Sequence, residues 1–163
     1  MQSTAPADGQ VLIVGGGPVG VAAGLMCASR GLAVVVLERA TEVYNLPRAI
    51  VMDDEIQRVL SLAGTGNRLR AITSMLPGAE FVDTSRTRIM GFELPDDADA
   101  GNGYAPVVRY YQPDLEAFLR AEAMRAGVDL RLGVEVASVG QDASSVWATL
   151  ATHDVARGER RPH

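Results

Sequence analysis

Three glycines near the N-terminus have the spacing of a phosphate-binding loop. The run Gly15-x-Gly17-x-x-Gly20 follows the apolar stretch Val11–Val14, and Pro18 stands where a helix would begin. The first glycine permits a tight turn, the second lets a phosphate approach the backbone, and the third lets a helix pack closely on a strand. Because free N–H groups at a helix N-terminus attract anions, the chemistry predicted here is the binding of a pyrophosphate.

An acid at the end of the next apolar run completes the pattern. Glu38 stands 18 residues after Gly20 and follows the strand-like run Ala33–Leu37. A carboxylate at this place accepts hydrogen bonds from the hydroxyls of an adenosine ribose, and it repels a 2′-phosphate. The stretch Val11–Glu38 is therefore predicted to be a β-α-β unit that binds FAD or NAD and disfavours NADP. The alternative is a glycine-rich turn and a solvated acid that bind nothing.

The elements that must position this loop predict an α/β fold with a Rossmann-like β-α-β domain. The first helix is expected from Pro18 to Arg30, and Gly31 ends it. In a strand that alternates apolar and polar residues, Trp147 is expected to pack into the core. The remaining expected elements are helices at 53–63, 65–72 and 113–126, strands at 79–83, 87–93, 107–111, 129–132, 133–139 and 145–151, and a polar loop at 96–103.

Composition excludes several classes of function. The 163 residues carry a net charge of −5, and the 15 arginines are scattered, so a nucleic-acid partner is not expected. No apolar run approaches the roughly 20 residues that span a bilayer, so no membrane association is expected. The single cysteine, Cys27, cannot form a disulfide within the chain, which favours a cytoplasmic location. No metal site is predicted.

The segment after Glu38 resembles a known family. The run Pro47-Arg48-Ala49-x-x-x-Asp53-Asp54-Glu55 and the step Gln112-Pro113 at the beginning of a helix are similar to the flavoprotein aromatic hydroxylases of the para-hydroxybenzoate hydroxylase fold. The likeness is strongest to the 3-(3-hydroxyphenyl)propionate hydroxylases, and it covers nearly the whole chain but only the N-terminal part of a family member. Without this resemblance, Arg48 would be a loop arginine and Gln112 a helix cap. Asp53 and Asp54 are expected to be charges at a helix start rather than a catalytic pair.

The resemblance implies FAD as the cofactor, NADH or NADPH as a transient reductant, and a small phenolic substrate that is hydroxylated with O₂. It implies that Arg48 lies against the flavin nucleotide and that Gln112 hydrogen-bonds near its ribityl or pyrophosphate region. No catalytic residue is identified. The expected cofactor-binding residues are Gly15, Gly16, Gly17, Pro18, Val19, Gly20, Glu38, Arg39, Arg48 and Gln112.

The expected organisation is a disordered N-terminus at 1–9, an FAD-binding domain at 10–152 and a frayed tail at 153–163. Strands within about 79–111 would belong to part of a substrate-domain sheet. The resemblance implies a fold truncated at the C-terminus, because family members continue into a further strand with a Gly-Asp-Gly type of motif. Such a fragment is expected to be inactive alone, with a second copy or a complementing C-terminal chain left open as partner. An NAD-dependent dehydrogenase domain and an inactive nucleotide-binding remnant are the alternatives.

Overall fold

A parallel sheet forms the centre of the computed structural model, which describes residues 11–46 and 48–151. Its strands are β1 (Val11–Val14), β2 (Val34–Glu38) and β8 (Asp129–Leu132), in the order β1-β2-β8. All neighbours in it are parallel. The predicted N-terminal β-α-β unit and the α/β class are thereby confirmed, while the proposed ends at 1–9 and 153–163 lie outside the described residues.

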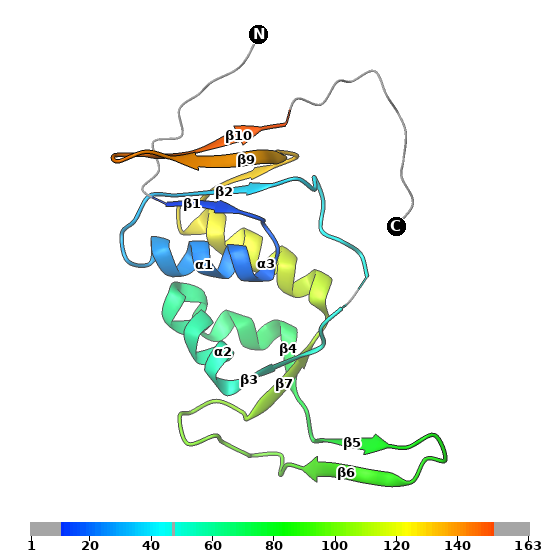
Figure 1. Ribbon diagram of the computed structural model, residues 1–163. Coiled ribbons are helices and arrows are strands. Elements are labelled where there is room, and N and C mark those ends of the chain that lie inside the picture. The colour runs from blue at the N-terminus through cyan, green and yellow to red at the C-terminus, as the bar shows by residue number, and fades with distance from the viewer. Residues whose placement is uncertain (1–10, 47, 152–163) are drawn as a thin grey trace.

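Two helices and a hairpin cover the faces of this sheet (Figure 1). Helices α1 (Pro18–Ala28) and α3 (Gln112–Arg125) lie on one face, and the antiparallel pair β9 (Val136–Gln141) and β10 (Val146–Leu150) crosses the other. Helix α1 consists of apolar and small residues around its whole circumference, as expected for a helix buried between a sheet and another helix.

The core lies between the sheet and the two helices. Val21 and Leu25 of α1 and Leu119 and Ala123 of α3 belong to one buried cluster, and each is at most 1% exposed. At Gly24 an added Cβ would lie 3.2 Å from Val36 Cγ2 in β2. Helix α1 therefore packs closely on the sheet at this residue, which has no side chain. This packing fixes the N-terminal end of α1 relative to the carboxyl ends of β1 and β2.

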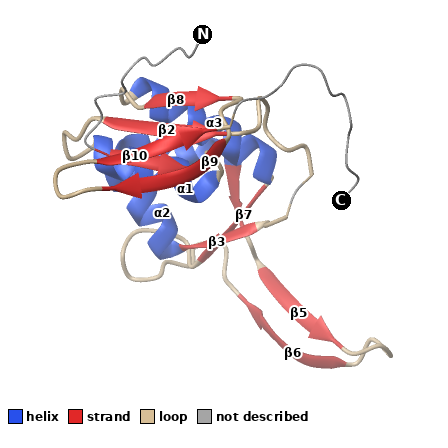
Figure 2. Ribbon diagram, turned by 45° about the horizontal axis from the view of Figure 1, so that its top comes forward, coloured by secondary structure: helices blue, strands red, loops and turns tan. Residues whose placement is uncertain are grey.

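A second group of elements lies on the far side of the helices from the hairpin β9–β10, as Figures 1 and 2 show. A small antiparallel sheet has the order β3-β7-β4, and the pair β5–β6 extends away from the body. These elements are β3 (Val51–Asp53), α2 (Asp54–Leu60), the π-helical turn η1 (Ser61–Thr65), the 3₁₀ helix η2 (Gly66–Ile72), β4 (Thr73–Met75), β5 (Gly78–Val82), β6 (Arg88–Glu93) and β7 (Val107–Tyr110).

The structure differs from the sequence expectations at the end of α2 and at β3 and β4. The helix expected at 53–63 ends at Leu60, because the π-helical turn after it contains Gly64 with φ +105°. Strands β3 and β4 were not predicted, since three residues carry no readable alternation and form only by pairing with β7. Asp53 does act at a helix start, as expected: its Oδ1 accepts from the Ile56 N–H at 2.8 Å.

The expectation that Trp147 packs into the core is wrong. Its side chain is 47% exposed and lies on the outer face of the hairpin, over Gly140 of the paired strand. An added Cβ at Gly140 would come within 2.6 Å of the Trp147 ring, so the glycine makes room for the indole. Alternation along a strand indicates two faces but does not say which of them is covered.

One buried acid joins α3 to η2. Glu122 is 5% exposed, and its two carboxylate oxygens accept from Arg68 Nε at 3.1 Å and Arg68 Nη2 at 2.6 Å, with Arg125 as a further partner. Hydrogen bonding from Arg68, assisted by Arg125, holds the pKa of the Glu122 carboxyl below its ordinary value of 4.5. The native state therefore binds fewer protons than the unfolded chain, and this contribution to stability is lost as the pH falls.

We expect Glu122→Gln to lower the free energy of unfolding by about 1 kcal/mol at neutral pH, because it removes a charged hydrogen-bond acceptor. The loss stays small because the side chains of both arginine partners are largely exposed. The difference from the wild type should shrink as the pH falls below the ordinary glutamate pKa and through the lowered one. Urea denaturation at neutral pH and at about pH 3 measures both values. Glu55→Gln, which removes the exposed pair with Arg58, is the matched control and should change stability less. An equal loss at both pH values would contradict the role of Glu122.

Candidate functional site

The glycine loop, residues 15–20, joins β1 to α1 and is fixed at both ends. Gly15 has φ +105°, a conformation that side chains disfavour, and its N–H donates to the Leu37 carbonyl of β2 at 2.8 Å. At Gly20 an added Cβ would lie 1.9 Å from the Gly15 carbonyl oxygen, so α1 approaches the loop too closely for a side chain. The backbone conformation of Gly15 and the close packing at Gly20 therefore explain the first and third glycines of the motif.

The second glycine of the motif has no such explanation within the protein. Gly17 is the N-cap of α1 with extended φ −75° and ψ −177°, and an added Cβ would meet no atom within 4 Å. In the described part of the chain, no side chain caps α1, and its first turn carries no acid. Pro18 begins the helix and Val19 is 84% exposed. An uncapped, partly positive helix end beside unfilled space fits the pyrophosphate of FAD.

Glu38 ends β2 and holds the glycine loop. Its Oε2 accepts from the Gly16 N–H at 2.6 Å, and its Oε1 accepts from the Ala40 N–H at 2.7 Å. Each oxygen of a carboxylate has a second lone pair, so Glu38 keeps the capacity to accept from ribose hydroxyls. The sequence predicted the ribose contact, which stays a prediction, but it gave no sign of this anchoring of the loop.

The arginine loop, residues Arg48 and Ala49, lies against the beginning of α3. Gln112 Oε1 accepts from the backbone N–H groups of both loop residues at 2.8 Å. The Arg48 guanidinium carbon lies 5.2 Å from the centroid of the Tyr44 ring, and its side chain is 66% exposed. A guanidinium held over an aromatic ring in this way keeps donors free for phosphate oxygens.

Gln112 is buried, and its amide is largely used within the protein. It is 6% exposed, its Oε1 already accepts two hydrogen bonds, and its Nε2 donates to Glu116 Oε1 at 2.7 Å. One N–H of the amide is left as a donor. The expected contact of Gln112 with the ribityl or pyrophosphate region stays a prediction, and it is now restricted to donation from this remaining N–H.

The structure brings the expected residues together in two groups. Gly16 and Glu38 meet at the glycine loop, whereas Arg48 and Gln112 meet at the arginine loop. Arg39 is exposed and follows the last residue of β2. Sequence reasoning missed Glu116 and Arg120, two further polar residues buried on α3. The signal that could have found them is the four-residue spacing from Gln112, which places all three on one side of a helix.

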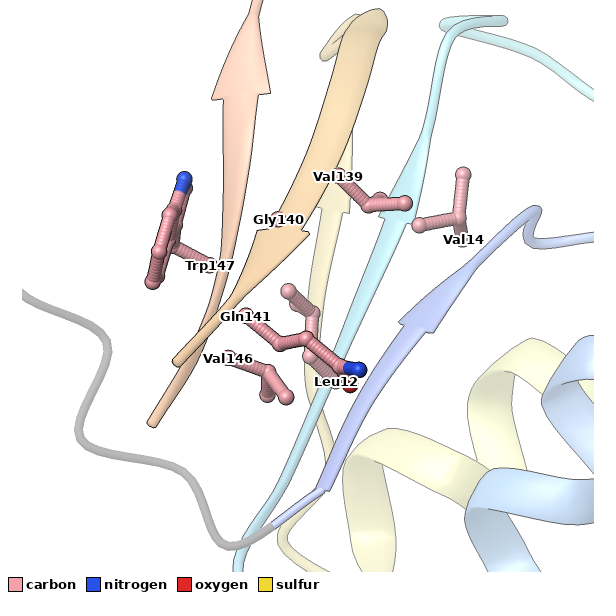
Figure 3. A pocket seen from close by; sticks show the side chains of 7 residues that line it. All are labelled: Leu12, Val14, Val139, Gly140, Gln141, Val146 and Trp147. Carbon is pink, nitrogen blue, oxygen red and sulfur yellow. The ribbon is translucent and has the colours of Figure 1, made fainter. Parts of the chain in front are cut away.

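An apolar cavity of about 420 Å³ lies between β1 and the hairpin β9–β10 (Figure 3). Its lining residues are Leu12 and Val14 of β1 and Val139, Gly140, Gln141, Val146 and Trp147 of the hairpin. None of its lining side chains is titratable or nucleophilic. The cavity therefore lies between the parallel sheet and the hairpin, and its lining offers no group that could act in catalysis.

At residues 11–46 and 48–151, no group of histidine, cysteine and acidic side chains has the arrangement of a metal site. Within the same ranges, no helix combines the length and the apolar character that crossing a membrane requires.

Comparisons with known proteins connect this geometry to one family. The family described as FAD binding domain matches residues 8–161. A probable NADH-specific resorcinol 4-hydroxylase of Rhodococcus jostii is 35% identical over 132 residues, which are 80% of this chain and 24% of the relative. A 3-(3-hydroxy-phenyl)propionate/3-hydroxycinnamic acid hydroxylase of Comamonas testosteroni is 30% identical over 148 residues, 90% of this chain and 25% of the relative.

A solved structure agrees with these relatives. The p-nitrophenol 4-monooxygenase of Pseudomonas putida superimposes with a TM-score of 0.71 at 26% identity, over 86% of this chain and 35% of that one. The chain spans about a quarter of the length of the curated relatives that it resembles. Because the family model and these relatives match most of its length, the chain belongs to the FAD-binding domain family of flavin-dependent aromatic hydroxylases.

Proposed function

We propose that this chain is the FAD-binding portion of a flavoprotein monooxygenase that hydroxylates a phenolic ring with NADH or NADPH and O₂. The observation that carries the proposal is the open space at Gly17, beside the uncapped N-terminus of α1. The positive φ of Gly15 and the close packing at Gly20 require glycine there, but only a ligand gives a reason for glycine at Gly17, the second glycine of the motif. The names of the curated relatives support a phenolic substrate.

In this proposal each group of residues holds one part of the cofactor. The N–H groups at the beginning of α1 bind the pyrophosphate, and the Glu38 carboxylate accepts from the adenosine ribose. Arg48 pairs with the flavin nucleotide through its exposed guanidinium. Bound FAD supplies the redox chemistry, while the protein binds and orients it and excludes water. Arg39 stays a candidate contact at the exposed end of β2.

The strands within about 79–111 are proposed to form part of the wall of the substrate site. Strands β5 and β6 are a two-stranded ribbon that extends from the body, and Phe81, Ile89 and Met90 on it are 58%, 68% and 61% exposed. A two-stranded ribbon with such surfaces is marginally stable by itself in water. An apolar surface of this kind suits contact with an aromatic ring or with further strands.

The binding of FAD is tested by titrating the purified 163-residue chain with FAD and following flavin fluorescence and the melting temperature. We expect saturable quenching and a rise in melting temperature with FAD, and a smaller rise with NAD. A larger stabilisation by NAD would favour the dehydrogenase alternative. A colourless protein that neither nucleotide stabilises would favour the nucleotide-binding remnant and overturn the proposal.

Hydroxylation by this chain alone is not expected. The described residues include the two loops for the nucleotide, and they offer only the β5–β6 ribbon as a wall for an aromatic substrate. The chain is therefore expected to need a complementing polypeptide, or a second copy, to enclose the flavin. Incubation with FAD, NADH or NADPH, and resorcinol or 3-hydroxyphenylpropionate, followed by chromatography, should yield no hydroxylated product. Product above the level of an FAD-only control would contradict this expectation.

The cellular location is proposed from composition. One cysteine, Cys27, is compatible with a reducing cytoplasm, where a flavoprotein meets NADH and NADPH.

A further inference from the structure

A row of three buried polar side chains runs along α3. Gln112, Glu116 and Arg120 are spaced four residues apart and are only 6%, 4% and 8% exposed. Burial of polar and charged groups opposes folding unless each of them is hydrogen-bonded. Leu119 and Ala123 of the same helix belong to the apolar core, so apolar residues are readily accommodated beside this row. The polar row needs a reason other than the packing of α3.

The first part of the row holds the arginine loop. Gln112 Oε1 accepts from the backbone N–H groups of Arg48 and Ala49 at 2.8 Å, and Gln112 Nε2 donates to Glu116 Oε1 at 2.7 Å. The second hydrogen bond fixes which way the Gln112 amide points, so that its oxygen faces the loop. Glu116 Oε1 also lies 4.0 Å from Arg48 Nη2, on the side of the loop that faces α3.

The far part of the row holds the glycine loop. Arg120 Nη2 donates to the Gly16 carbonyl oxygen at 3.3 Å, across 104 residues of chain. Its Nε finds no hydrogen-bond partner in the described part of the chain. Gly16 is also the residue whose N–H donates to Glu38, so Arg120 and Glu38 hold the same residue through its carbonyl and its N–H.

We propose that this row sets the distance between the two loops of the cofactor site, with Glu116 and Arg120 as positioning residues. Two helical turns separate Gln112 from Arg120, which corresponds to about 12 Å along α3. The helix therefore holds the arginine loop at one place and the glycine loop at another, and the residues that it contacts there, Gly16 and Arg48–Ala49, belong to no helix or strand. The part of this inference that concerns FAD rests on the proposed function, while the positioning of the loops can be measured without any cofactor.

Glu116 variants test the first contact by amide hydrogen exchange of the cofactor-free chain. We expect Glu116→Ala to speed exchange of the Arg48 and Ala49 amides about tenfold, because Gln112 loses the partner that orients it. Glu116→Gln keeps an acceptor for Gln112 Nε2 and should restore slow exchange. The Gly16 amide should not change in either variant.

Arg120 variants test the second contact in the same way. Arg120→Met keeps the length of the side chain but removes the donor, and it should speed exchange of the Gly16 amide about tenfold. Arg120→Lys supplies a donor again and should recover much of the protection. The Arg48 and Ala49 amides should be unaffected.

The matched control is Glu122→Ala, which removes another buried, hydrogen-bonded acid from the same helix. Glu122 contacts Arg68 and Arg125 and neither loop, so this variant should lower the melting temperature while exchange at both loops keeps its wild-type rate. With FAD, Glu116→Ala and Arg120→Met should each raise the Kd about tenfold, and Glu122→Ala should leave it within about twofold. Since the two contacts lie on different loops, their effects should be additive in free energy, and the double variant should bind FAD about a hundredfold more weakly than the wild type.

The outcomes separate this inference from the proposed function. Faster exchange at both loops in every variant, the Glu122 control included, would mean general destabilisation and would overturn the inference. Wild-type exchange in Glu116→Ala and Arg120→Met would also overturn it, even if the wild type binds FAD. Loop-specific changes in a chain that does not bind FAD would support the positioning role and reject the proposed function.

Discussion

Replacing Gly17 with serine is expected to stabilise the protein while weakening FAD binding about a hundredfold. Serine is a favoured N-cap, and the backbone at Gly17 suits any residue, so the free energy of unfolding should rise by about 0.5–1 kcal/mol. The new hydroxyl would accept from the N–H groups at the beginning of α1 and fill the space beside them. Two charge-assisted hydrogen bonds to a phosphate, lost together, correspond to about a hundredfold in Kd. Urea denaturation and FAD titration measure the two opposite changes.

The matched control for this variant is Gly20→Ala. An added Cβ there meets the Gly15 carbonyl at 1.9 Å, so the loop must shift, and the free energy of unfolding should fall by about 3 kcal/mol. Both substitutions lie in the glycine loop, but they act on stability in opposite directions. If Gly17→Ser bound FAD as tightly as the wild type, the pyrophosphate would not lie at this helix end.

Replacing Glu38 with arginine is expected to weaken FAD binding by a similar factor, about a hundredfold. The substitution removes the acceptor for the ribose hydroxyls, and it removes the hydrogen bonds that hold Gly16 and Ala40. Fluorescence titration with FAD measures the loss. Unchanged affinity would show that the ribose assignment is wrong.

A milder variant separates the two roles of Glu38. Glu38→Gln keeps one oxygen, which can still accept from the Gly16 N–H, but it lacks the second carboxylate oxygen. FAD binding should weaken about tenfold, whereas FMN, which has no adenosine ribose, should bind as it does to the wild type. An equal loss for both flavins would mean that Glu38 acts only by holding the glycine loop.

Much of the nucleotide site could be predicted from local sequence, because it depends on short-range backbone geometry. Gly15 has a positive φ, Gly20 lies too close to the Gly15 carbonyl for a side chain, and Glu38 follows an uninterrupted apolar strand. Each requirement concerns residues within one β-α-β unit. The same holds for Asp53, which caps the helix that begins directly after it.

The errors lie where distant segments decide the structure. Strands β3 and β4 exist through pairing with β7, whereas the early end of α2 has a local cause, the positive φ of Gly64 in η1. Trp147 follows the expected alternation, but it lies on the outer face of its hairpin. A strand's period of two indicates its faces, whereas the layer that covers a face is set by the rest of the chain.

The glycine spacing and its acid were enough for the sequence alone to indicate a dinucleotide site, and the resemblance after Glu38 favoured FAD. The family comparisons confirmed that choice. Only the tertiary structure placed Gln112 against Arg48, across 64 residues, and Arg120 against Gly16, across 104. The physical reason is that a hydrogen bond across the fold depends on how α3 packs against the sheet and α1. No local pattern of residue types encodes that arrangement.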